Sequence, residues 1–70
     1  MSETIQIIVN GLREAVPAGS TMASLIELFE EDHPELIAEL NGRFVHPQDY
    51  AAREVGEGDR VEFINAAFGG

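Results

Sequence analysis

The chain has 70 residues, which is enough for one domain with a small core and too few for a deep substrate pocket. It has 13 acidic residues against four arginines and no lysine, for a formal net charge of −9. This charge repels phosphate backbones and therefore disfavours nucleic-acid binding, so no nucleic-acid partner is expected. It favours a basic partner surface, although it is equally consistent with plain solubility. Because cysteine is absent, disulfides, thiolate nucleophiles and cysteine-ligated zinc are excluded.

Residues 4–9 are rich in β-branched side chains, which predicts a strand. Asn10-Gly11 follows at once and is typical of a type I′ hairpin turn, so residues 12–16 are predicted to return as a second strand. The apolar runs are at most three residues long, and no signal peptide precedes the first strand. We therefore expect no membrane association and a cytoplasmic protein that is a monomer when free.

A helix is predicted next, because the apolar side chains recur at the spacing of one helical face. These side chains are Met22, Leu25, Ile26 and Phe29. Ser20 or Thr21 can cap the first turn, and Pro34 prevents continuation of the helix.

The remaining chain alternates short strands and turns. Residues 35–40 have helix-forming side chains, but six residues that run into Asn41-Gly42 favour a strand at 36–40 paired with 43–45. Pro47 suits the start of a short helical turn. Residues 56–59 form a loop, and the alternating pattern of residues 60–65 predicts a half-buried last strand.

These elements predict an α+β domain with a mixed sheet of four to five strands, covered on one face by one main helix. The first and last strands are the most apolar, so we place them side by side and parallel in the centre. This is the layout of a β-grasp (ubiquitin-like) fold. The domain is expected to span residues 1–65, with a flexible tail at 66–70 that ends in Gly-Gly.

The motifs of the chain, in their order, resemble the ThiS-type sulfur carriers of the ThiS/MoaD family. They are NG at residues 10–11, PAGST at 17–21, NGxxVxP at 41–47, GxGDxVxF at 56–63 and GG at 69–70. The resemblance covers essentially the whole chain. Gly-Gly alone is a common dipeptide, whereas the ordered set is specific.

The resemblance implies a carrier rather than an enzyme, with no catalytic residue and no bound cofactor of its own. A ThiF-like adenylating enzyme would use ATP to activate the Gly70 carboxylate, and sulfur from a desulfurase relay would convert it to a thiocarboxylate. A ThiG-like thiazole synthase would then take the sulfur for thiamin. Related carriers of the MoaD type serve molybdopterin, cysteine or methionine synthesis. A non-reactive β-grasp interaction module is the alternative from another class.

The chemistry of the last residues agrees with this implication. A terminal carboxylate is unreactive at neutral pH and needs activation, in a site that excludes water. Gly69 and Gly70 lack Cβ atoms, so a narrow site can admit them closely. Phe68 either anchors in a partner pocket or folds back on its own sheet. The other interpretation of the tail is a frayed terminus without function.

A partner surface is predicted on the face of the sheet opposite the helix. Ile8 and Ile64 are out of phase with the apolar positions that face the helix, so they are expected to lie together on the open face. Leu36, Ala38 or Leu40 is expected beside them. Scattered surface apolar residues are the alternative. His33 and His46 have no metal-ligand spacing, so no metal site is predicted.

Overall fold

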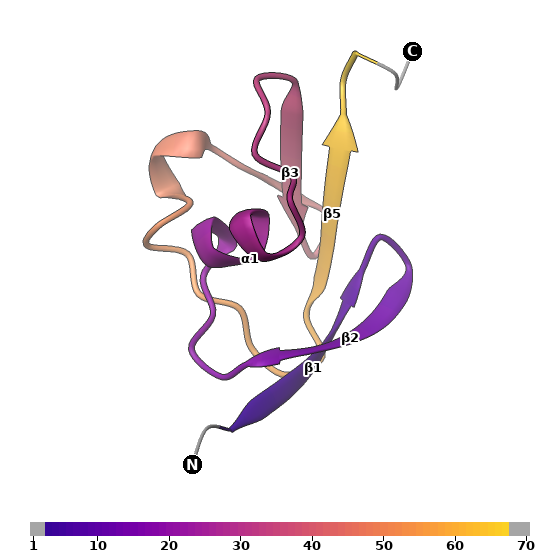
Figure 1. Ribbon diagram of the computed structural model, residues 1–70, viewed down its shortest axis with the longest axis vertical. Coiled ribbons are helices and arrows are strands. Elements are labelled where there is room, and N and C mark those ends of the chain that lie inside the picture. The colour runs from indigo at the N-terminus through magenta and orange to yellow at the C-terminus, as the bar shows by residue number, and fades with distance from the viewer. Residues whose placement is uncertain (1–2, 68–70) are drawn as a thin grey trace.

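The computed structural model describes residues 3–67. Along the chain these residues form β1 (Thr4–Val9), β2 (Leu12–Pro17), α1 (Met22–Leu28), β3 (Leu36–Leu40), β4 (Arg43–Val45), the short 3₁₀ helix η1 (Pro47–Asp49) and β5 (Arg60–Asn65). The strands form one sheet in the order β2-β1-β5-β3-β4 (Figure 1). β1 and β5 are parallel neighbours at the centre, and the other pairs are antiparallel. The predicted β-grasp fold is confirmed.

Both predicted hairpins form at their Asn-Gly dipeptides. Asn10 and Gly11 have φ values of 50° and 84°, and Asn41 and Gly42 have 53° and 82°. Type I′ turns require positive φ at both positions, which asparagine and glycine tolerate best. The segment 36–40 is a strand, as predicted, although its side chains favour a helix. Tertiary pairing overrides propensity here, because all five of its residues pair with β5.

The helix begins where the sequence predicts and ends before Pro34 is reached. The Thr21 hydroxyl accepts a hydrogen bond from Ser24 N at 3.1 Å, and the Ser24 hydroxyl accepts one from Thr21 N at 2.9 Å, so Thr21 is the cap. At the other end Glu30 has φ +57°, and Glu31 N donates to the carbonyl of Ile26 at 2.8 Å. This turn closes the helix in the manner of a Schellman motif, so the proline is not what stops it.

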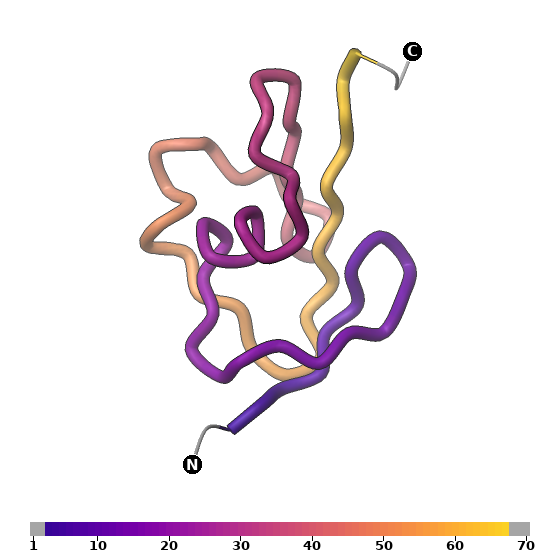
Figure 2. Tube along the Cα trace, in the orientation of Figure 1, coloured from indigo at the N-terminus to yellow at the C-terminus, as the bar shows by residue number. Residues whose placement is uncertain are grey.

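One face of the sheet packs against α1 to form the core. The most deeply buried large side chains are Ile7, Val16, Met22, Leu25 and Val61. The segment after β4 closes the same side, because Met22 N donates to the carbonyl of Arg53 and Val55 N to that of Ser20. Figures 1 and 2 show α1 and this segment on one side of the strands. The opposite face of the sheet carries no helix within the described residues, and we call it the exposed face.

Candidate functional site

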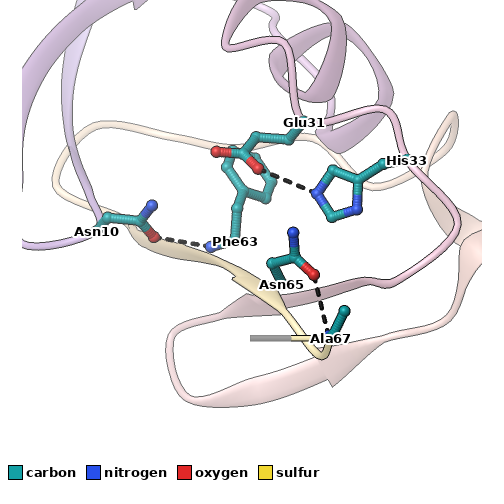
Figure 3. A network of polar contacts seen from close by, with 6 residues as sticks. All are labelled: Asn10, Glu31, His33, Phe63, Asn65 and Ala67. Atoms are coloured by element: carbon teal, nitrogen blue, oxygen red, sulfur yellow. Dashed lines mark hydrogen bonds and ion pairs between the residues drawn. The ribbon is translucent and has the colours of Figure 1, made fainter. Parts of the chain in front are cut away.

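The base of the tail is fixed by two hydrogen bonds at the end of β5. Ala66 N donates to the carbonyl of Glu35 at 2.9 Å, and Ala67 N donates to Oδ1 of Asn65 at 3.0 Å (Figure 3). The three tail residues for which the sequence predicts a role lie outside the described residues; they are Phe68, Gly69 and Gly70. The structure therefore defines the point and the strand from which the tail departs.

The loop between α1 and β3 leads into this contact and carries a half-buried histidine. Nε2 of His33 lies 3.4 Å from Oε1 of Glu31, and its Nδ1 is buried without a hydrogen-bond partner in the described part of the chain (Figure 3). The backbone carbonyl of His33 accepts a hydrogen bond from Leu36 N at 3.2 Å. The side chain of His33 is thus half-buried in the loop that leads into β3.

Both turn asparagines hold β5 in place, which the sequence reading missed. Oδ1 of Asn10 accepts a hydrogen bond from Phe63 N at 2.8 Å, just where β1 has ended and the parallel ladder would otherwise stop (Figure 3). Oδ1 of Asn41 accepts one from Arg60 N at 2.9 Å. Each hairpin turn is therefore tied to the strand that carries the tail. No local pattern signals these bonds, because asparagine is also the ordinary residue at the first central position of a type I′ turn.

The exposed face holds Ile8 and Ile64, but it does not bring them together. Ile8 pairs with Arg60, so Ile64 lies four residues further along β5. Both side chains are half-buried, and their chain neighbours Ile7 and Phe63 are buried on the helix side. The residue directly opposite Ile64 is Ile37. The prediction of one joint patch around Ile8 and Ile64 is wrong in this respect.

The predicted neighbours of that patch are on the other face. Ala38 is completely buried, and Leu36 and Leu40 pack against the same core. Ile37 and Glu39 alternate with them and face away from α1, because successive side chains of a strand point to opposite faces. The prediction of which β3 side chains lie on the exposed face is therefore wrong. Apolar and polar residues do not alternate in this strand, so the sequence alone does not show which side chains face the core.

Charged side chains are mostly unpaired in the described part of the chain. Within residues 3–67 the one close contact between an acidic and a basic side chain joins Glu31 to His33, and all four arginines are exposed. Within these residues no three His, Asp or Glu side chains gather as a metal site, and no helix is long and apolar enough to cross a membrane. Burial raises the pKa of the Tyr50 hydroxyl above its usual value.

Comparison with known proteins decides the family. The sequence model described as "ThiS family" matches residues 3–70, which includes both terminal glycines. The chain belongs to the ThiS family. Members of this family are small carrier proteins rather than enzymes. No curated protein sequence matches the chain.

A solved structure supports the assignment of this chain to the ThiS family, because it has the same fold. The crystal structure described as a thiamine biosynthesis protein (ThiS) from Geobacter metallireducens superposes with a TM-score of 0.82 at 26% sequence identity. The alignment covers 94% of this chain and 100% of that one. The likeness therefore extends over nearly the whole chain.

Proposed function

We propose that this ThiS-family protein carries sulfur as a thiocarboxylate on Gly70 and donates it for thiazole formation in thiamin biosynthesis. The observation that carries the proposal is the family match, which continues past β5 to residue 70. The anchored end of β5 supports it, because a rigid strand sets the position from which residues 66–70 depart.

The first step is activation by an ATP-dependent adenylating enzyme of the ThiF type. A carboxylate oxygen of Gly70 attacks the α-phosphorus of ATP, and pyrophosphate leaves. The resulting mixed anhydride is prone to hydrolysis, so the enzyme has to enclose it away from water. Two glycines without Cβ atoms suit such a narrow enclosure.

The second step forms the carbon–sulfur bond. Hydrosulfide attacks the activated carbonyl, AMP leaves, and the terminus becomes a thiocarboxylate. A persulfide from a desulfurase relay attacks through its terminal sulfur, and AMP leaves to give an acyl disulfide. A thiol reductant then takes the inner sulfur into a disulfide, which releases the same thiocarboxylate. A thiazole synthase of the ThiG type then accepts the sulfur. The carrier supplies no catalytic side chain and binds no cofactor in this scheme.

Intact-mass spectrometry tests the proposal. The protein is incubated with ATP, Mg²⁺, sulfide and the ThiF-type enzyme of the same organism. We expect one terminal oxygen to be replaced by sulfur, and fragmentation should place the change on Gly70. A protein that gains no sulfur under these conditions contradicts the proposal.

Gly70→Ala separates the role of the terminus from folding. The variant should keep the thermal unfolding midpoint of the natural chain, because Gly70 lies beyond the anchored end of β5. Its adenylation should fall by about tenfold or more if the added Cβ obstructs a narrow site. Equal adenylation of both chains would remove the argument from the missing Cβ.

A further inference from the structure

One hollow of the surface is lined by two arginines and by no acidic residue. It lies at the β4 edge of the sheet and has a volume of about 260 Å³; its walls are Leu40, Arg43, Phe44, Val45 and Arg53. Val45 is buried in the core, and Arg43 is directly opposite Leu40, which packs against that core. Because residues opposite one another share a face, Arg43 lies on the α1 side of the sheet, apart from the exposed face.

Positive charge is scarce in this chain, so its local excess at this hollow is informative. The hollow holds two of the four arginines, and neither guanidinium has a carboxylate partner within residues 3–67. The other two arginines differ, because Arg60 shares a hollow with Glu62 and Arg13 shares one with Glu57. A net charge of −9 repels free anions, so an anion can bind only where local cations outweigh that repulsion. The hollow at β4 meets this condition.

Both arginines project from backbone that is fixed by hydrogen bonds. Arg43 is the first residue of β4, directly after a hairpin turn. Arg53 N donates to the carbonyl of Asp49 at 3.0 Å, and the carbonyl of Arg53 accepts a hydrogen bond from Met22 N at 2.9 Å. The two side chains therefore start from fixed points, which lowers the entropy lost when a ligand orders them.

The open edge of β4 adds a backbone donor to the hollow. In a two-residue hairpin the residues that flank the turn form a hydrogen-bonded pair, and the next pair along the strands does not. Leu40 and Arg43 flank the turn, so Glu39 and Phe44 are a non-hydrogen-bonded pair. The N–H of Phe44 therefore points away from β3, out of the edge of the sheet. Two guanidinium groups and one outward N–H thus border the same hollow, and all three donate well to oxyanions.

We propose that this hollow binds the phosphate group of a phosphate monoester. Two guanidinium charges match a phosphate dianion better than they match a single carboxylate, and each planar guanidinium can donate two parallel hydrogen bonds to its oxygens. Leu40, Phe44 and Val45 supply apolar walls that inorganic phosphate would leave bare, so the organic part of the ester lies against them. The ligand class is therefore a small phosphorylated molecule with an apolar or ring-shaped part.

The hollow is separate from the base of the tail. Leu40 is opposite Val61 near the beginning of β5, whereas Leu36 is opposite Asn65 at its end, from which the tail departs. The four-residue step from Leu40 to Leu36 spans about 13 Å of strand. A ligand in the hollow therefore leaves the end of β5 uncovered, and this proposal does not depend on the proposed function.

NMR titrations of the full, nitrogen-labelled chain test the site. Phenyl phosphate, inorganic phosphate and benzoate are added in separate titrations at neutral pH and constant ionic strength. We expect saturable shifts of the Phe44 amide signal and of the Nε–H signals of Arg43 and Arg53. Phenyl phosphate should bind about threefold or more tightly than inorganic phosphate, because its ring buries apolar surface. It should bind about tenfold more tightly than benzoate, which has the same ring but a single charge.

Paired substitutions separate the hollow from the general charge of the surface. Arg43→Gln with Arg53→Gln should weaken phenyl phosphate binding by about tenfold or more, whereas Arg13→Gln with Arg60→Gln removes the same charge and should alter it less than about twofold. Arg43→Lys with Arg53→Lys keeps the charge but removes the planar donors, so it should weaken binding by about threefold or more. All four arginines are exposed, so the Tm of each variant should stay within about 4 °C of the natural value.

The outcomes decide each part of the proposal. Absence of a saturable shift at Phe44, or equal weakening by the two glutamine pairs, would overturn the site. Equal binding of phenyl phosphate and inorganic phosphate would overturn the contact with the apolar walls. Equal binding of phenyl phosphate and benzoate would overturn the preference for a dianion. None of these results bears on the carrier function, which the gain of sulfur at Gly70 tests separately.

Discussion

Side chains that pack under α1 alternate along the same strands with side chains on the exposed face, yet the two sets differ in how well they suit folding. On the covered face Ile7 and Val61 are 1% exposed, and Leu25 of the helix is completely buried against them. On the exposed face Glu39 and Glu62 oppose each other with like charges. The covered face satisfies the ordinary rules of core packing, and the exposed face does not.

This difference indicates that the side chains under α1 are determined by stability, whereas those on the exposed face also meet another requirement. Strand pairing positions both faces at once, so a side chain on the exposed face can change without repacking the core. Residues that lower stability are retained where another demand acts on them. The following predictions test how far residues of the two faces, and of the turns beside them, differ in their contribution to stability.

The largest effect is expected from truncation under the helix. Leu25→Ala should lower the free energy of unfolding by about 2–5 kcal/mol, because it leaves a cavity in a closely packed core. Ile8→Ala on the exposed face should cost about 1 kcal/mol, because Ile8 is only half-buried. Urea unfolding monitored by circular dichroism measures both values. Equal losses would show that the exposed face also contributes a packed core.

A smaller effect is expected from the turn that anchors β5. Asn10→Gly keeps the positive φ of the turn but removes the acceptor for Phe63 N, so it should cost about 1–3 kcal/mol. Asn41→Gly should cost less, because water can replace its more exposed bond to Arg60 N. Urea unfolding of the two variants gives the comparison. A larger loss for Asn41→Gly would contradict the assigned role of Asn10.

The helix terminus offers a gain in stability. Glu30 has φ +57°, a conformation that costs an L-residue with a Cβ but suits glycine, so Glu30→Gly should stabilise the fold by about 0.5–1 kcal/mol. Thermal unfolding followed by calorimetry measures the change. Glu27→Gly, inside the helix, is the control and should be destabilising by about 1 kcal/mol. A lower Tm for Glu30→Gly would mean that the glutamate side chain stabilises this turn.

The smallest effect concerns alkaline pH. Burial raises the pKa of Tyr50 above its usual value of 10.0, so the native state resists its ionisation more than the unfolded chain does. This contribution is fully present below pH 10.0 and is lost as the pH rises through the native pKa. Stability should therefore fall more steeply above pH 10.0 in the natural chain than in Tyr50→Phe. Urea titrations at several alkaline pH values check the sign.

Local signals in the sequence predict most of the fold. The two Asn-Gly turns and the apolar spacing from Met22 to Phe29 place the hairpins and the helix correctly. The central position of β1 and β5 follows from their apolar character. These features depend on short-range chemistry, which a single sequence displays.

The exposed face could be predicted only in part, because its details depend on register. The side chains of Leu36-Ile37-Ala38 do not alternate in polarity, so their phase appears only once β3 is paired with β5. The distance between Ile8 and Ile64 depends likewise on how the parallel pair is aligned. The bonds from the turn asparagines to β5 join positions far apart in the chain, and no local pattern announces them.

The position of β5 has a consequence for the rate of folding. In the strand order β2-β1-β5-β3-β4, the two hairpins do not pair with each other, and β5 joins them. Each hairpin closes through neighbouring residues, whereas β5 must meet a strand that lies near the other end of the chain. Closing so long a loop costs entropy before its contacts are gained, which slows folding relative to helical domains of this size. We expect insertion of β5 between two preformed hairpins to be the slow step that makes the domain fold as one unit.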